Sequence, residues 1–228
     1  MQRLKLLKIL QWITLLFVIL ITFLLIVITF LRWVNPPITA VMISERENIK
    51  GNKFNNWITL ESLGNNISLA IVASEDSNFC AHSGFDFSEI FKVGKKGSAR
   101  GASTISQQVS KNLFLWRARS WTRKGIEAVI TVLIEALWPK KRILEVYLNI
   151  AETGKGYFGV ASIAQKRFGK EPKKLSLKQA AYIAVTLPNP KKRNAGKLTQ
   201  KLKNQAKKVQ IGATTLKMEG RASCFITE

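Results

Sequence analysis

The chain of 228 residues contains few of the side chains on which common catalytic centres depend. Its only cysteines are Cys80 and Cys224, its only histidine is His82, and its only aspartates are Asp76 and Asp86. Cys80 and His82 could supply two ligands where a structural zinc site takes four, so we do not expect a zinc enzyme. The two cysteines allow one disulfide, but unpaired thiols are the more common state for such residues, and we favour thiols.

Two families of acylating enzymes are also excluded. A Ser–His–Asp triad would need His82 as its base, and no G-x-S-x-G sequence is present. The S-x-x-K and K-T-G sequences of penicillin-binding transpeptidases are absent as well. The sequence therefore gives no support to covalent catalysis by serine.

Acidic residues are scarce relative to basic ones. There are 36 Lys and Arg against 14 Asp and Glu, a formal net charge of +22. Such a surface attracts nucleic acid, anionic lipid or phosphorylated substrates, and the charge alone does not choose among them. Residues 173–217 contain twelve basic residues and no acid, and we expect their last part to form a basic helix or tail on anionic lipid.

One long apolar run stands at the start of the chain. Residues 9–31 carry no charge, and about 20 apolar residues suffice to cross a bilayer as a helix. The basic tail 1–8 favours a cytoplasmic N-terminus, with the body of the chain on the other side. A cleaved signal peptide is the alternative, but the run is long and ends at bulky Arg32 and Trp33, so we favour a retained transmembrane anchor.

The rest of the chain predicts a mainly α-helical body over residues 38–218 and a C-terminal tail over 219–228. Ser103 or Thr104 can cap a helix that begins at Ile105, and Ser120 can cap the longest helix of the body, which stops at Pro139. Further helices are expected over 68–75, 85–93, 140–152, 161–169 and 177–187, the last with a Ser176/Gln179 capping box. The glycine-rich stretches 94–101 and 153–159 are expected as a mobile loop and a turn.

Residues 75–127 have an unusual charge pattern. Nine Lys or Arg residues and no acid lie between Glu89 and Glu127. Arg119, Arg123 and Glu127 follow at i, i+4 and i+8, so they share one face of a helix start, where backbone N–H groups and cations favour phosphate. A solvated, charged helix start is an equally good interpretation. Carboxylates with cationic support suit glycosyl transfer or glycoside cleavage.

Four segments in this order resemble the peptidoglycan glycosyltransferase family, which includes the monofunctional biosynthetic peptidoglycan transglycosylases. They are EDSNFCAHSGFD, GASTISQQVSKN, RSWTRKGIE and KKRILEVYLN, within a motif core of about residues 55–190. The resemblance implies a lysozyme-like helical domain, with a large lobe and a smaller membrane-proximal jaw, behind one transmembrane helix.

The resemblance also implies the reaction and its setting. Lipid II would be polymerised into β-1,4 glycan with inversion, and undecaprenyl diphosphate would leave. The implied location is the inner membrane, with a single-pass anchor and a periplasmic catalytic domain. Lipid II, the growing glycan strand, membrane lipids and cell-wall synthesis proteins are the implied partners, and nucleic acid is not. Mg²⁺ or Mn²⁺ is the implied cofactor, near Glu127 through the diphosphate, with no organic cofactor.

Site residues follow from the same resemblance. It implies Glu75 as the base that deprotonates the acceptor 4-hydroxyl and Glu127 as a second essential carboxylate. Lys111, Arg119 and Arg123 match the cations that hold the diphosphate. The other matched positions would bind substrate or shape the site, although some could simply pack or cap a helix: Asp76, Phe79, His82, Ser103, Thr104, Gln107, Gln108, Asn112 and Lys124. For His82 we favour a structural hydrogen bond over proton transfer.

Two other functions remain open. A lytic enzyme on the same fold would use a lone acid to protonate a glycosidic oxygen, but it has no need of a cationic clamp. A membrane-tethered polyanion binder suits the basic tail, but few aromatic residues stand among the basic ones. One departure from the family concerns residues 87–100, a stretch shorter than expected in many members.

Overall fold

The structure is a computed structural model that describes residues 2–45, 57–96, 102–118 and 120–226. The chain divides into two compact units, Met1–Asn35 and Pro36–Glu228. Arg119 and part of the glycine-rich loop, residues 97–101, lie outside the described residues.

The first unit is one helix, α1 (Gln2–Leu31). Most of its apolar side chains are exposed, which a helix in water would not favour. Among the described residues, Lys5–Leu31 is the one stretch of helix long and apolar enough to cross a membrane by length and composition. It contains the predicted run 9–31, and it fits a single-pass membrane anchor.

The second unit is mainly helical, as predicted. Its elements are α2 (Ala40–Ser44), α3 (Leu60–Leu63), α4 (Asn65–Glu75), α5 (Phe87–Lys96), α6 (Ile105–Phe114), α7 (Trp121–Leu137), α8 (Lys140–Ile150), β1 (Glu152–Gly154), β2 (Tyr157–Phe158), α9 (Val160–Phe168), the 3₁₀-helix η2 (Pro172–Lys174), α10 (Leu177–Ala184) and α11 (Gln200–Met218). The two strands pair as an antiparallel hairpin over the predicted turn 153–159.

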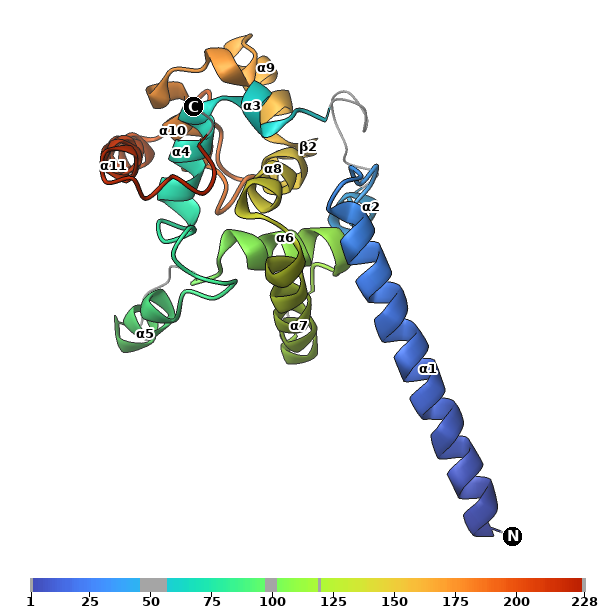
Figure 1. The fold of residues 1–228 in the computed structure, drawn as a ribbon. Coiled ribbons are helices and arrows are strands. Elements are labelled where there is room, and N and C mark those ends of the chain that lie inside the picture. Colours follow the sequence, from blue (N-terminus) through green and yellow to red (C-terminus); the bar gives the residue numbers. More distant parts are fainter. Residues whose placement is uncertain (1, 46–56, 97–101, 119, 227–228) are drawn as a thin grey trace. The chain divides into compact units, whose positions relative to one another are not determined.

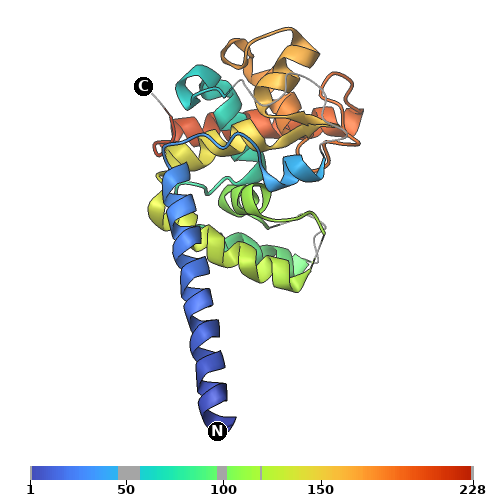
Figure 2. The ribbon, with the colours of Figure 1, turned by 90° about the vertical axis from the view of Figure 1, so that its right-hand side faces the viewer.

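Helix α6 lies at the centre of this unit. It packs against α7 and α8, while α4 packs against α10 and α11. In both views α6 lies between α7 on one side and the group of α4, α10 and α11 on the other (Figure 1 and Figure 2). The core side chains of α4, α6 and α8 include Ile71, Ile105 and Leu144, all fully buried. The ends of these helices are therefore fixed by packing.

Helix starts follow the polar residues that the sequence offers as caps. Thr104 and Gln107 form a reciprocal capping box on α6, and the Ser120 side chain accepts a hydrogen bond from Arg123 N on α7. Ser176 and Gln179 form the predicted capping box on α10. Each satisfies backbone N–H groups that a helix start leaves without partners.

The two cysteines correct the expectation of free thiols. Cys80 and Cys224 form a disulfide across 144 residues of sequence, with their Cα atoms 5.7 Å apart. The bridge joins the loop after α4 to the segment after α11, where Phe225 is buried. Sequence spacing gave no sign of this pairing because the two residues meet only through the packing of α11 along α4.

Candidate active site

Glu75 is the last residue of α4, and its carboxylate is held by a neighbouring helix. The Nε2 atom of Gln108, on α6, donates a hydrogen bond to Glu75 Oε2 at 3.1 Å. The hydroxyl of Tyr147, on α8, donates to Gln108 Oε1, also at 3.1 Å. An ionised carboxylate only accepts, so the amide nitrogen faces Glu75 and the amide oxygen faces Tyr147. Three helices thus contribute to one hydrogen-bonded chain that orients Glu75.

Burial is the largest cause of the raised pKa of Tyr147, which lies well above its ordinary value, and the charges of Glu75 and Asp76 add to it. Tyr147 therefore keeps its proton and stays a donor. The Tyr147 side chain is buried, as expected for a residue on the apolar face of an amphipathic helix. No sequence pattern indicated the hydrogen bond from Tyr147 to Gln108.

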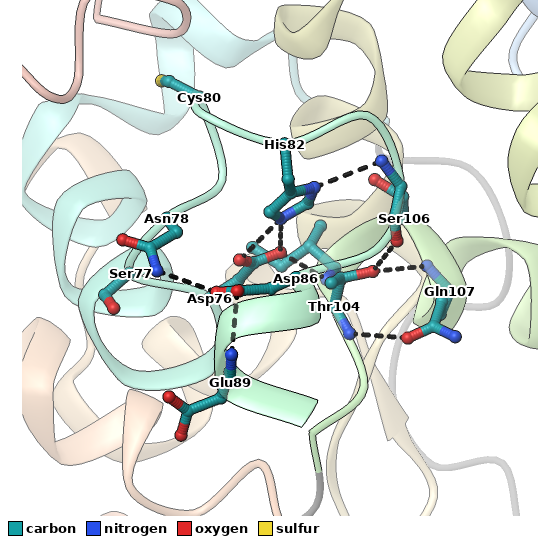
Figure 3. A network of polar contacts seen from close by, with 12 residues as sticks. Asp76, Ser77, Asn78, Cys80, His82, Asp86, Glu89, Thr104, Ser106 and Gln107 are labelled. Atoms are coloured by element: carbon teal, nitrogen blue, oxygen red, sulfur yellow. Dashed lines mark hydrogen bonds and ion pairs between the residues drawn. The ribbon is translucent and has the colours of Figure 1, made fainter. Parts of the chain in front are cut away.

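Asp76 and His82 connect the loop after α4 to the start of α6. Gly84 N donates to His82 Nδ1 at 3.2 Å, so the proton lies on Nε2, which donates to Asp76 at 2.9 Å (Figure 3). Asp76 Oδ2 also accepts from Ile105 N at 2.9 Å. Asp76 therefore joins the loop after α4 to the first residue of α6. This geometry supports the structural interpretation of His82.

Thr104 and Gln107 serve the same junction. Thr104 Oγ1 donates to Gly84 O at 2.6 Å, while Thr104 N donates to Gln107 Oε1 at 3.0 Å (Figure 3). Gly84 has φ +94°, a region that favours glycine, and a Cβ there would lie 3.0 Å from Thr131 Cγ2. The junction therefore needs glycine at this position.

A cluster of three cations surrounds one buried carboxylate on α6 and α7. Arg123 Nη1 donates to Glu127 Oε2 at 2.6 Å, and Lys124 Nζ pairs with Glu127 Oε1. Lys124 also donates to Ser103 Oγ at 3.3 Å. Lys111 completes this cation cluster, and Glu127 is only 3% exposed. The i, i+4 pairing of Arg123 with Glu127 agrees with their predicted common face.

The pKa of Lys111 is lowered, chiefly because its ammonium group is buried. The Glu127 carboxylate raises it, while Arg123, Arg117 and Lys124 lower it further. Positive charges outnumber the carboxylate here, so an anion entering the cluster would be attracted by cations that the protein only partly neutralises.

The cation cluster opens into a cleft of about 800 Å³. Its lining includes many predicted site residues: Ser103, Gln107, Gln108, Lys111, Asn112, Arg123, Lys124 and Glu127. Glu75 does not line the cleft itself but contacts Gln108, which does. Asp76, Phe79, His82 and Thr104 are not among the lining residues, and Phe79 is fully buried. The structure therefore brings eight of the predicted site residues together at the cleft and links Glu75 to them through Gln108.

Comparison with known proteins identifies the family. The family model described as transglycosylase matches residues 42–214. The chain belongs to the transglycosylase family. Its relatives include proteins named biosynthetic peptidoglycan transglycosylase from Jannaschia sp. (strain CCS1), 43% identical over 83% of this chain and 79% of the relative, and from Stutzerimonas stutzeri (strain A1501), 45% identical over 89% and 85%. The relative of that name from Pseudomonas aeruginosa is 45% identical over 75% and 78%.

This member of the transglycosylase family has a second group of charges at the cleft that sequence reasoning missed. Arg117 pairs with both Glu45 and Glu152, and Lys191 Nζ donates to Glu45 Oε1 at 2.7 Å. Arg117, Glu152 and Lys191 line the cleft. Glu45 and Lys191 are 146 positions apart, so no local pattern could have paired them.

Glu45 owes its lowered pKa first to the hydrogen bond from Lys191. Burial opposes that shift, and Arg117 adds to it. Glu45 is therefore held in its ionised form by two cations from distant parts of the chain.

The His, Cys, Asp and Glu side chains that the structure describes do not form a metal site made of protein ligands alone. Both Glu127 oxygens accept from cations, and among the described residues no three His, Cys, Asp or Glu side chains gather as a metal site would require. The implied Mg²⁺ or Mn²⁺ at the diphosphate stays a prediction.

Proposed function

We propose that the chain is a peptidoglycan glycosyltransferase that polymerises lipid II into β-1,4 glycan and releases undecaprenyl diphosphate. The observation that carries the proposal is the cation cluster of Lys111, Arg123 and Lys124 at a cleft next to Glu75. Family membership and the name of the relatives support the same reaction.

In this mechanism the acceptor sugar O4 attacks the donor sugar C1. The C1–O bond to the diphosphate breaks, and its electron pair leaves with the diphosphate. Glu75 takes the proton from the acceptor 4-hydroxyl, and attack opposite the leaving group inverts the anomeric centre. Gln108 and Tyr147 hold the carboxylate in a fixed orientation for this transfer.

The cation cluster acts on the leaving group. Negative charge grows on the diphosphate as the bond breaks, so fixed cations stabilise the transition state more than the ground state. Glu127 holds Arg123 and Lys124 in place through its two oxygens. Arg119, which lies outside the described residues, is proposed to join the same cations from the loop before α7.

The proposed location is the inner membrane, with a cytoplasmic N-terminus and a periplasmic catalytic domain. Helix α1 supports a single-pass anchor, and the basic tail before residue 9 supports this orientation. A lipid-linked substrate would then reach the cleft from the bilayer. The growing glycan strand, membrane lipids and cell-wall synthesis proteins are the proposed partners.

The test is to incubate the purified full-length chain with lipid II and resolve the products by mass. We expect glycan strands and released undecaprenyl diphosphate. Lys111→Ala should slow the reaction strongly, whereas Lys178→Ala, at an exposed position on α10, should not. Failure to extend lipid II, together with shortening of purified glycan strands, would identify a lytic enzyme instead.

A further inference from the structure

The segment after α11 returns to cover the loop that follows Glu75. Arg221 Nη2 donates to Ser77 O at 2.9 Å and to Asn78 Oδ1 at 2.8 Å. Cys224 is bonded to Cys80. In Figure 1 this red segment runs back past α4. Residues 219–226, here called the C-terminal strap, are thus attached at two places within four consecutive loop residues.

A buried aromatic contact adds a third attachment. Phe225 is 1% exposed, and its ring centroid lies 6.3 Å from that of Phe79, which is fully buried. Lys140 Nζ lies 4.5 Å from the centroid of the Phe79 ring and donates to His82 O at 2.7 Å. The strap and the start of α8 therefore both contact the loop.

This support matters because Glu75 occupies an intrinsically unfavourable position. A carboxylate at the C-terminal end of a helix is disfavoured by the helix dipole. The residue that follows, Asp76, leaves helical geometry with φ −160° and ψ 71°. The placement of Glu75 therefore depends on how firmly the adjoining loop is held, and each attachment that is lost lowers the free energy of opening the loop locally.

We propose that the C-terminal strap is a positioning element for Glu75, secured to the active-site loop by the Cys80–Cys224 disulfide. This inference rests on the proposed role of Glu75 as the base. The strap contacts residues 77–80 of the loop through Arg221, Cys224 and Phe225, whereas the cation cluster lies on α6 and α7. Loosening the strap should therefore lower kcat and leave binding of the diphosphate unchanged.

The test compares the oxidised full-length chain with the chain treated with a dithiol reductant. The reductant converts the disulfide to two thiols and itself becomes a cyclic disulfide. No other cysteine is present to react. We expect kcat on lipid II to fall by about 10- to 100-fold, as for a small misplacement of a catalytic group, and to recover on reoxidation. KM and the affinity for inorganic pyrophosphate should stay constant.

Variants separate the strap from general effects of reduction. The double variant Cys80→Ser/Cys224→Ser should be slow and insensitive to reductant. Arg221→Gln should lower kcat without touching the disulfide. Lys217→Gln removes the same charge from an exposed position at the end of α11 and should have no effect. Unfolding curves for each variant establish that the rates are measured on folded protein.

Amide hydrogen exchange over residues 76–84 gives a readout independent of activity. Reduction should speed exchange in this loop and leave the N-terminal half of α7 unchanged. The inference is overturned if exchange is unaltered, or if exchange rises while kcat stays constant in folded protein. If the oxidised wild-type chain makes no glycan, the proposed function fails, and loop exchange alone then decides whether the strap holds the loop.

Discussion

The counterion role of Glu127 can be tested by Glu127→Gln. The substitution preserves the shape of the side chain, so it creates no cavity, but it removes the negative charge. Arg123 is nearly as buried as Glu127, with side chains 10% and 4% exposed. Lys111 is half-buried, and desolvation is the largest cause of its lowered pKa. The variant therefore leaves Arg123 and Lys111 poorly solvated and without the carboxylate that balances their charge.

Removing one partner of a buried ion pair costs about 3–5 kcal/mol of folding free energy. For Glu127→Gln the loss of folding free energy should lie near the lower end, at about 3 kcal/mol. The glutamine oxygen can still accept one hydrogen bond, and the Lys124 side chain is 38% exposed and so remains solvated. Inorganic pyrophosphate should recover part of the loss, because a bound anion can take the place of the missing carboxylate.

The assay is equilibrium urea unfolding of the full-length chain in detergent, followed by tryptophan fluorescence. Glu171→Gln is the matched control. It removes the acid of an exposed i, i+3 pair with Lys174, whose side chains are 69% and 70% exposed, and surface pairs contribute about 0–1 kcal/mol. A loss no larger than that of the control would refute the claim that Glu127 is the counterion of the cation cluster.

Three further predictions concern Tyr147, Asp86 and divalent metal. Tyr147→Phe keeps the buried ring but removes the donor to Gln108, so kcat should fall about tenfold at constant KM. In a Gln108→Leu background the same change should add little, because Tyr147 acts on Glu75 through Gln108. Burial raises the pKa of Asp86, but hydrogen bonds from Ser88, Glu89 N and Asn78 outweigh it and lower the pKa to about 2. Ionised Asp86 therefore stabilises the fold above its ordinary pKa of 3.8, and this contribution is lost as the pH falls to about 2; Asp86→Asn should flatten urea-unfolding stability across that range. Chelation of divalent metal should slow glycan synthesis less than Lys111→Ala does, because the cations of the cluster remain.

Helix caps, the Arg123–Glu127 pair and the anchor helix were predictable because each depends on residues that are close together in the sequence. Thr104 is one of the two caps that the sequence offered for α6, and the predicted Ser176/Gln179 capping box has the three-residue spacing that a helix start imposes. The Arg123–Glu127 pair follows from the i, i+4 geometry of a helix. The anchor helix likewise follows from an uninterrupted apolar run.

Long-range contacts were not predictable, since the sequence carries no pattern for them. Tyr147 reads as one more core residue of an amphipathic helix until the fold places its hydroxyl beside Gln108. Cys80 and Cys224 look like two isolated thiols until α11 packs along α4. The roles of Glu75 and Glu127 came from resemblance to a family, and they stay predictions until the variants are measured.

Single-turnover release of undecaprenyl diphosphate from lipid II by Glu75→Gln tests the central claim most directly. The variant keeps the cation cluster, so it should bind lipid II and pyrophosphate as the wild-type chain does. Loss of the base should slow release by about 10²- to 10⁴-fold, the usual contribution of general base catalysis. Release at the wild-type rate by a folded Glu75→Gln chain would contradict the account.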